Sequence, residues 1–485
     1  MFLLSLREKI SESLSEAIGA PANQISLFLT MISVLPFCVL NYFIHGKYPR
    51  LIYSLVLGLF FQISIYKYNF IHIFISAIFT YLFIAFYGRK LSAFYVLIFS
   101  IVYLSYLHIK RMFEDYGGWT IDDPTTIYMM SICKFSSLAF SYEDGEKDIN
   151  TIYNSHHREY RVVEKPTLLE VLSFIYFYPT SIVGPSIEFK DFINFINEAD
   201  CYSNLTKNLG YLIKYSLLYF FGSFVAIAYC TIVTSKVPLA STYEEEFGKH
   251  NFLYKLAYLY LCFPGIRARY YSGWFMSYSG LILCGISYTE KKDKDGKIIK
   301  SLEKGNYGSV IAVEWNSIYP KEAINEWNKT IHLWLKYNVY LRVINIEHKK
   351  LKNNKSLASL ITFICSAIWH GYYLTYYTTF FVLYCYQSGC LILEQKGVYD
   401  WIRKTKYLIP FVSVLNCVVI ETIGIMFFNL EWHKAVMALK NYKYFPFIFH
   451  FGFFIFTKFL KVPKKPKKVD NTIKEKEKET TKKVE

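Results

Sequence analysis

Long apolar runs, separated by short polar segments, organise most of this 485-residue chain. A helix needs roughly 20 mostly apolar residues to cross a bilayer, and many of the runs approach that length. They occupy residues 26–44, 51–67, 68–88, 91–108, 168–184, 209–234, 272–288, 356–395, 407–429 and 444–460. Because the run 356–395 is long enough for two helices, the pattern predicts about 11 membrane segments. A shorter run at 252–264 predicts a re-entrant segment.

The polar segments divide the chain into three parts. Residues 1–25 mix charged side chains with Leu and Ile up to Pro21, which predicts an amphipathic helix on the membrane surface. Residues 26–460 form the predicted membrane domain. The tail, residues 461–485, is rich in Lys and Glu and has too few apolar residues to build a core, so we expect it to be disordered. Three polar loops interrupt the membrane domain, at 141–165, 290–304 and 345–355.

Composition supports an all-α integral membrane protein with many crossings. Hydrophobic residues make up 53% of the chain and charged residues 19%, which leaves too little charge to cover a soluble protein of this size. The net charge of +16 is carried by Lys and Arg between the apolar runs and in the tail. This distribution suits anionic lipid headgroups, or a polyanionic substrate such as a coenzyme A ester. The sequence has no RNA- or DNA-binding motif, so we expect no nucleic-acid partner.

The ten cysteines are scattered, mostly within apolar runs, and none forms a CxxC pair. Because metal ions need clustered ligands, we expect neither a metal site nor a bound cofactor. The motifs of soluble enzymes, such as the P-loop, GxGxxG, HExxH and GxSxG, are also missing. Candidate chemistry must therefore be sought among polar residues inside apolar segments, where such residues are costly.

The first candidate segment is INEWNKTIHLWLKYNVYLR, residues 324–342. If it is one helix, Asn328, His332 and Arg342 lie on a common face with Leu335 and Val339. Trp327 belongs to the opposite, aromatic side. Periodicity alone leaves two interpretations open, a functional polar stripe or an interfacial helix with one wet face.

The second candidate is His370, which lies in an apolar run without any charged residue. An imidazole in such a place must find a polar partner or line a cavity. On a continuous helix Ser366, Tyr373 and Tyr377 share its face, and the bland alternative is a neutral histidine bonded to one of these hydroxyls. Glu421 is a third intramembrane polar residue. It can pair with a basic group or bind a headgroup amine, and we interpret it as structural. His108 and the Tyr178–Pro179 pair are weaker candidates.

The sequence WNKTIHLWLKYNVYLRV, followed by SAIWHG, resembles the two signature blocks of the membrane-bound O-acyltransferase superfamily. Further blocks in the same order resemble its lysophospholipid acyltransferase branch: GWTIDDPTTIYMMSICKFSSLAFSYEDG, YPTSIVGPSIEFKDF and RARYYSGWFMSYSGLILCG. Together they cover roughly residues 118–381. The sequence departs from the family pattern in the short segment after Gly371 and in Tyr278, which replaces an acidic residue.

The resemblance implies a polytopic fold around a central chamber, with the family's near-invariant pair, Asn328 and His370, facing it. Asn328 is expected to orient the substrate. It implies transfer of a fatty acyl group from acyl-CoA to the free hydroxyl of a lysophospholipid, with His370 as the general base. Acyl-CoA is a co-substrate in this reaction and not a cofactor. We expect the substrate to contact Trp327, His332, Arg342, Ser366, Trp369 and Tyr373.

Two other functions stay open, an acyltransferase of this family that modifies a protein or another small acceptor, and a membrane transporter without enzymatic activity. The oligomeric state is not predicted. We expect a multi-pass protein of the endoplasmic reticulum membrane with a cytosolic C-terminus. Lys482 and Lys483 resemble a dilysine retrieval signal, and a lysine-rich tail suits the cytosolic side.

Overall fold

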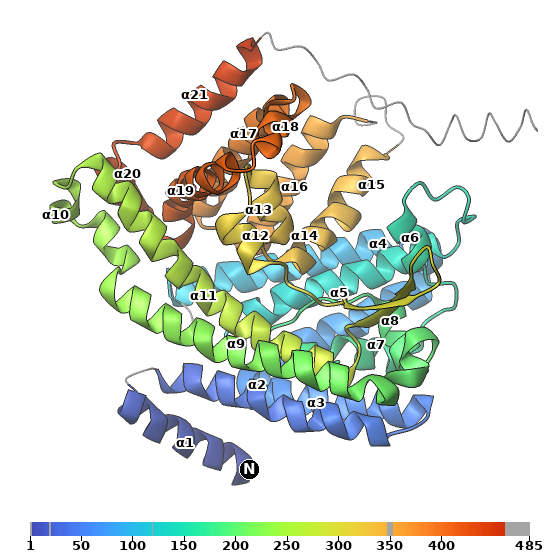
Figure 1. The fold of residues 1–485 in the computed structure, drawn as a ribbon. Helices are drawn as coiled ribbons and strands as arrows, with labels where there is room; N and C mark the ends of the chain where they lie inside the picture. Colours follow the sequence, from blue (N-terminus) through green and yellow to red (C-terminus); the bar gives the residue numbers. More distant parts are fainter. Residues whose placement is uncertain (1, 19–20, 119, 347–352, 461–485) are drawn as a thin grey trace, which may run out of the picture.

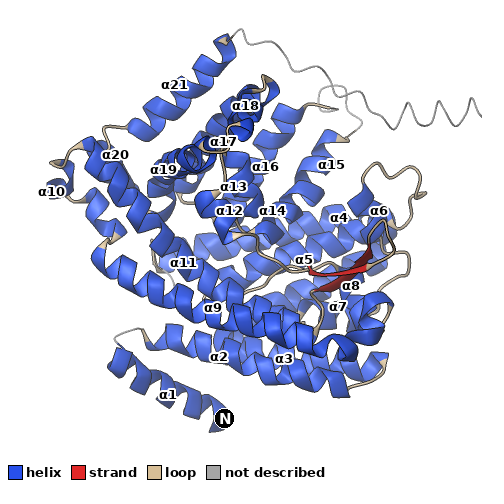
Figure 2. Cartoon of the chain, in the orientation of Figure 1, coloured by secondary structure: helices blue, strands red, loops and turns tan. Residues whose placement is uncertain are grey.

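The computed structural model describes residues 2–18, 21–118, 120–346 and 353–460, which are mostly helical (Figure 2). The N-terminal half contains α1 (Phe2–Ile18), α2 (Ala22–Leu40), α3 (Lys47–Tyr66), α4 (Phe70–Glu114), α5 (Pro124–Asp144), α6 (Ser155–Tyr160), α7 (Leu168–Ile175), α8 (Phe189–Ile196), α9 (Leu209–Lys236), α10 (Glu245–Gly248) and α11 (Phe252–Cys284). The hairpin strands β1 (Tyr288–Lys292) and β2 (Ile298–Leu302) are followed by α12 (Val310–Trp315), α13 (Pro320–Glu326), α14 (Lys329–Leu335), α15 (Leu341–Ile344), α16 (Lys355–His370), α17 (Leu374–Gln395), α18 (Val398–Lys404), α19 (Leu408–Phe428), α20 (Trp432–Asn441) and α21 (Phe445–Phe459).

The long helices pack side by side in one body (Figure 1). In this view α1, α2 and α3 lie along the lower edge, and α9 and α11 run next to each other above them. The helices from α12 to α19 occupy the upper half, where α17 packs on both α16 and α21. α4 bends at Gly88 (φ 59°, ψ −142°), between the predicted runs 68–88 and 91–108. A glycine adopts this positive φ without the steric cost that a Cβ atom brings.

The polarity of α9 is the reverse of that in a soluble protein. Its outer face exposes large apolar side chains, while small hydroxyls are buried against the neighbouring helix. Ser216 of α9 and Ser279 of α11 form a hydrogen bond at 2.9 Å between their hydroxyl oxygens. Small polar residues between helices and apolar residues outside are typical of helices packed in lipid. The outward apolar residues include Leu217, Leu218, Phe221, Val225 and Ile232.

Among the described residues, four helical stretches are long and apolar enough to cross a membrane: Ala22–Phe43, Lys47–Glu114, Asp200–Tyr243 and Leu408–Phe428. Phe445–Phe459 is a shorter apolar helix. These stretches agree with an all-α membrane protein that crosses the bilayer several times. The predicted count of about 11 segments is not confirmed.

The predicted membrane segment at 168–184 is wrong. Its helix, α7, has 8 residues and is about 12 Å long, too short to cross a bilayer. The run is apolar because it fills the protein core: Phe174 and Phe177 are both completely buried. After α7 ends at Ile175, Pro179 lies in a separate short turn, Tyr178–Thr180, and does not continue the helix.

Two further boundaries differ from those predicted. The run at 252–264 is not a separate short segment, because α11 continues through Pro264 from Phe252 to Cys284. The polar loop at 290–304 contains part of an antiparallel hairpin, in which Tyr288 pairs with Leu302. The predicted disordered tail, residues 461–485, lies outside the described residues, as does 347–352 within the third polar loop.

Candidate active site

The segment around Asn328 is divided into short helices. α13 ends at Glu326, and Trp327 follows in an extended conformation (φ −82°, ψ 120°). Asn328 has left-handed backbone angles (φ 43°, ψ 56°), which asparagine tolerates better than most residues with a side chain. Its carbonyl oxygen accepts hydrogen bonds from the amides of Ile331 (3.0 Å) and His332 (3.1 Å). Asn328 therefore defines where α14 begins.

A π-helical turn, Lys336–Tyr340, separates α14 from α15. The predicted continuous helix over 324–342, with Asn328, His332 and Arg342 on one face, is therefore wrong. Asn328 precedes the helix, and a π turn shifts the register of the side chains after it. His332 lies half-buried on α14, about one turn after Asn328.

Hydrogen bonds to α5 hold this irregular segment. The Trp334 indole nitrogen donates to the Ser136 hydroxyl at 2.8 Å, and the Asn338 amide nitrogen donates to the Ser137 hydroxyl at 2.9 Å. All four side chains are buried. The partners are about 200 residues apart in sequence, so periodicity within 324–342 contains no information about them.

His370 is the last residue of α16, and the chain turns sharply after it. Gly371 has a φ of 129°, and α17 begins at Leu374. Ser366 lies on the same helix as His370 and is buried, whereas Tyr373 and Tyr377 lie beyond the turn. The predicted common face with these two tyrosines is therefore wrong, because glycine at a positive φ ends the helix.

Three contacts fix this turn. The His108 ring nitrogen Nε2 lies 3.1 Å from the Trp369 carbonyl oxygen, and the Trp369 indole nitrogen donates to the Met129 carbonyl at 2.7 Å. The Tyr373 hydroxyl accepts a hydrogen bond from the Gly117 amide at 2.9 Å. Trp369 and Tyr373, both predicted to contact substrate, are buried and have these structural partners.

A Cβ atom at Gly371 would make a tight contact of 3.2 Å with Nδ1 of His108, and the backbone angle favours glycine at this position as well. His108 therefore belongs to the turn after His370, and the sequence pattern gave it too little weight. The signal that could have found it was another histidine inside an apolar run.

Aromatic rings surround the His370 imidazole. Its centroid lies 5.3 Å from that of Phe380, 5.5 Å from that of Tyr376 and 5.0 Å from that of Phe427. The side chain is half-buried, and within the described part of the chain no hydrogen bond to its ring nitrogens is found. The bland alternative, a histidine bonded to Ser366 or a nearby tyrosine, therefore does not hold. An unpaired imidazole among aromatic rings is available to accept a proton from a ligand.

Three rings, Tyr270, Phe428 and Phe427, connect the two candidate regions, and we call them the aromatic bridge. Trp327, next to Asn328, lies 5.8 Å from Tyr270, measured between ring centroids. Tyr270 lies 6.3 Å from Phe428, Phe428 lies 5.0 Å from Phe427, and Phe427 contacts His370. The bridge comes from α11 and α19, so neither signature block supplies it.

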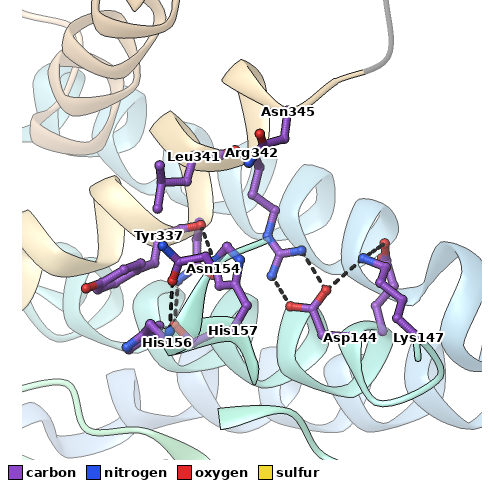
Figure 3. A network of polar contacts seen from close by, with 12 residues as sticks. Asp144, Lys147, Asn154, His156, His157, Tyr337, Leu341, Arg342 and Asn345 are labelled. Carbon is purple, nitrogen blue, oxygen red and sulfur yellow. Dashed lines mark hydrogen bonds and ion pairs between the residues drawn. The ribbon is translucent and has the colours of Figure 1, made fainter. Parts of the chain in front are cut away.

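Arg342 is engaged in an ion pair (Figure 3). Its guanidinium nitrogens lie 3.0 and 2.6 Å from the two carboxylate oxygens of Asp144, which also binds Lys147 at 2.7 Å. The guanidinium stacks on Phe140, 4.3 Å from the ring centroid. Arg342 therefore links α15 to the end of α5. The predicted contact of Arg342 with substrate did not foresee this structural role.

The short helix α6 packs on the same segment, as Figure 3 also shows. The His156 ring stacks on Tyr337 with 3.6 Å between centroids, and His157 Nε2 lies 3.0 Å from the Tyr337 carbonyl oxygen. Burial lowers the pKa of His157 to about 4, and nearby Arg342 acts in the same direction. His157 is thus neutral near pH 7 and can donate its Nε2 proton to that carbonyl. The π turn is thus held by α6 at Tyr337, and Arg342, just after it, is held by α5.

The profile of the membrane-bound O-acyltransferase family matches residues 60–431, a stretch that contains Asn328 and His370. The chain belongs to this family. The match covers α4 to α19 together with the C-terminal end of α3 and leaves α1, α2, α20 and α21 outside.

Several curated relatives have similar sequences. A lysophospholipid acyltransferase of Saccharomyces cerevisiae is 27% identical over 79% of this chain and 65% of its own length. Lysophospholipid acyltransferase 2 of Arabidopsis thaliana is 23% identical over 89% of this chain and 92% of its own. A lysophospholipid acyltransferase of Schizosaccharomyces pombe is 26% identical over 76% and 72%. The chain thus spans slightly less than two thirds of the length of the Saccharomyces protein.

Proposed function

We propose that this protein transfers a fatty acyl group from acyl-CoA to the free hydroxyl of a lysophospholipid. The observation that carries the proposal is the unpaired His370 imidazole at the end of α16, in a member of this family. The names of the curated relatives support the choice of acceptor, because they are lysophospholipid and glycerophospholipid O-acyltransferases.

The reaction needs a base, because a glycerol hydroxyl is hardly ionised near neutral pH. His370 takes the hydroxyl proton while the oxygen attacks the thioester carbonyl carbon. The C–S bond of the resulting tetrahedral intermediate then breaks, and the CoA thiolate takes the proton from the imidazolium. The side-chain amide of Asn328 donates a hydrogen bond to the developing oxyanion or holds the acceptor hydroxyl. We propose that both residues face a chamber between the membrane helices that opens to lipid and to water.

A direct test measures acyl transfer in membranes that express the chain. Labelled acyl-CoA is offered with a panel of lysophospholipids that differ in headgroup, and membranes with the His370→Ala variant serve as the matched control. We expect labelled phospholipid for at least one headgroup with the natural chain and none above background with the variant. Labelling of a protein or of another acceptor, without labelled phospholipid, would contradict the proposed acceptor.

We predict that transfer needs no metal ion. Among the described residues no group of three or more His, Cys, Asp or Glu side chains could hold one. Treatment with EDTA should therefore leave the turnover rate unchanged. Loss of activity on chelation, with recovery on adding back a single divalent ion, would contradict this prediction.

We also propose that the protein resides in the endoplasmic reticulum membrane with residues 461–485 in the cytosol. The abundance of lysine in this segment supports the orientation, because cytosolic segments near membrane helices carry an excess of basic residues. An epitope placed in this segment should be digested by protease in sealed microsomes without detergent. Survival of the epitope until the membrane is opened would mean the inverse orientation.

A further inference from the structure

Away from His370, two carboxylates share one guanidinium inside the helical body. Arg267 Nε donates to Glu314 Oε1 at 2.6 Å, and its Nη2 donates to Glu314 Oε2 at 2.5 Å and to Glu421 Oε1 at 2.8 Å. Glu421 is 1% exposed, and the other two side chains are also buried. We call these residues the buried triad.

The buried triad joins three helices at one point. Arg267 comes from α11, Glu314 from α12 and Glu421 from α19. The Tyr271 hydroxyl donates to Glu314 Oε1 at 2.7 Å, which adds a second bond between α11 and α12. Charged groups in such a place are stable only while they remain paired, so sliding of one helix against another is strongly disfavoured.

The buried triad has two carboxyl groups for one guanidinium. Arg267 binds both oxygens of Glu314 but only Oε1 of Glu421, and Oε2 of Glu421 is buried without a hydrogen-bond partner among the described residues. Glu421 is therefore dispensable for neutralising Arg267, because the pair of Arg267 with Glu314 is already neutral. What Glu421 adds is a direct bond from α11 to α19.

The same two helices carry the aromatic bridge. Tyr270 lies three residues after Arg267 on α11, and Phe427 and Phe428 lie six and seven residues after Glu421 on α19. At about 1.5 Å per residue, both ends of the bridge lie within roughly 11 Å of the buried triad along their helices. A shift of α19 along α11 would move Phe427 against His370 and separate Phe428 from Tyr270.

We propose that Arg267 and Glu421 are positioning residues, which hold α11 and α19 in register so that the aromatic bridge keeps the Asn328 segment and His370 aligned for acyl transfer. This inference rests on the proposed function. Small displacements of reacting groups can cost up to about a hundredfold in rate, so a lost bond between these helices should appear in kcat.

The test compares two substitutions of Glu421 in the purified full-length protein. Glu421→Leu removes the carboxylate bond to α19 and leaves only the longer contact of Arg267 Nη2 with the Cys417 sulfur, at 3.7 Å. Arg267 stays paired with Glu314, which should allow folding. Glu421→Gln removes the charge but keeps an oxygen that can accept from Arg267. We expect kcat per folded enzyme to fall at least about tenfold in the Leu variant and to recover most of its value in the Gln variant. KM for both substrates should stay within about twofold of the natural value in both variants.

Glu170→Leu is the matched control, because Glu170 is also a buried carboxylate, paired with Lys47 at 2.6 Å, but joins α7 to α3. It should lower thermal stability and leave kcat per folded enzyme unchanged. An unchanged kcat in Glu421→Leu, or an equal loss in Glu170→Leu, would overturn the proposal. Equal losses in the Leu and Gln variants, with a raised KM for lysolipids that carry a cationic headgroup, would instead mean that Glu421 binds the headgroup.

The natural chain and His370→Ala are measured in the same series. If the natural chain has no activity, or the His370 variant is fully active, the proposed function fails. If both behave as expected while Glu421→Leu is unaffected, the positioning role alone fails.

Discussion

Replacing His370 with alanine should abolish acyl transfer while the protein is still expressed and inserted into the membrane. The imidazole has no hydrogen-bond partner among the described residues, so its removal breaks no polar contact of the fold. It is, however, the proposed base. Loss of a positioned general base costs about 10²- to 10⁴-fold in rate, which would bring turnover to the background of a membrane assay.

The measurement is the rate of labelled phospholipid formation, normalised to the amount of monodisperse enzyme after detergent extraction. His433→Ala is a suitable control, because the His433 side chain is 69% exposed on α20, outside the candidate site. It should have normal activity. Normal turnover by the His370→Ala variant would remove His370 as the base.

Replacing Asn328 with alanine should lower kcat by at least about a hundredfold, as is typical for loss of a hydrogen-bond donor to an oxyanion. His332→Ala should lose less, although it lies about one turn away on α14. Since Asn328 has a left-handed backbone, alanine there also introduces steric strain. Asn328→Gly separates the two effects, because glycine accepts the backbone angles and still lacks the amide.

We expect the Gly and Ala variants of Asn328 to lose similar activity, and the Gly variant to be at least as stable in a thermal unfolding assay. Activity close to normal in Asn328→Gly would mean that strain, and not the lost amide, inactivates the Ala variant. A dead His332 variant beside an active Asn328 variant would transfer the proposed role to His332.

Many of the helices could be predicted from apolar runs alone. The runs at 26–44, 51–67, 209–234 and 407–429 each correspond to a helix. The run at 168–184 was misassigned because hydrophobicity does not distinguish contact with lipid from burial in protein. Its aromatic side chains pack against other helices, and this partner surface is formed by residues distant in sequence.

The candidate residues of the site could also be found in the sequence, but their surroundings could not. Polar residues in apolar segments are costly, which singled out His370 and Glu421. The pairing of Glu421 with Arg267 agrees with one of the roles expected for it, the partner of a basic group. The partner itself lies 154 residues away on another helix, beyond the reach of periodicity.

By itself, the sequence determined that this protein is a helical membrane protein of the O-acyltransferase family, because hydropathy and local motifs are encoded in neighbouring residues. Only the tertiary structure decided that Asn328 starts a helix and does not continue one, and that Arg342 binds Asp144. It alone decided that aromatic rings of α11 and α19 connect Trp327 with His370. Each of these features depends on a hydrogen bond, ion pair or ring contact between residues far apart in the chain. Such contacts override local helical preference because a buried polar group must be paired wherever its partner lies.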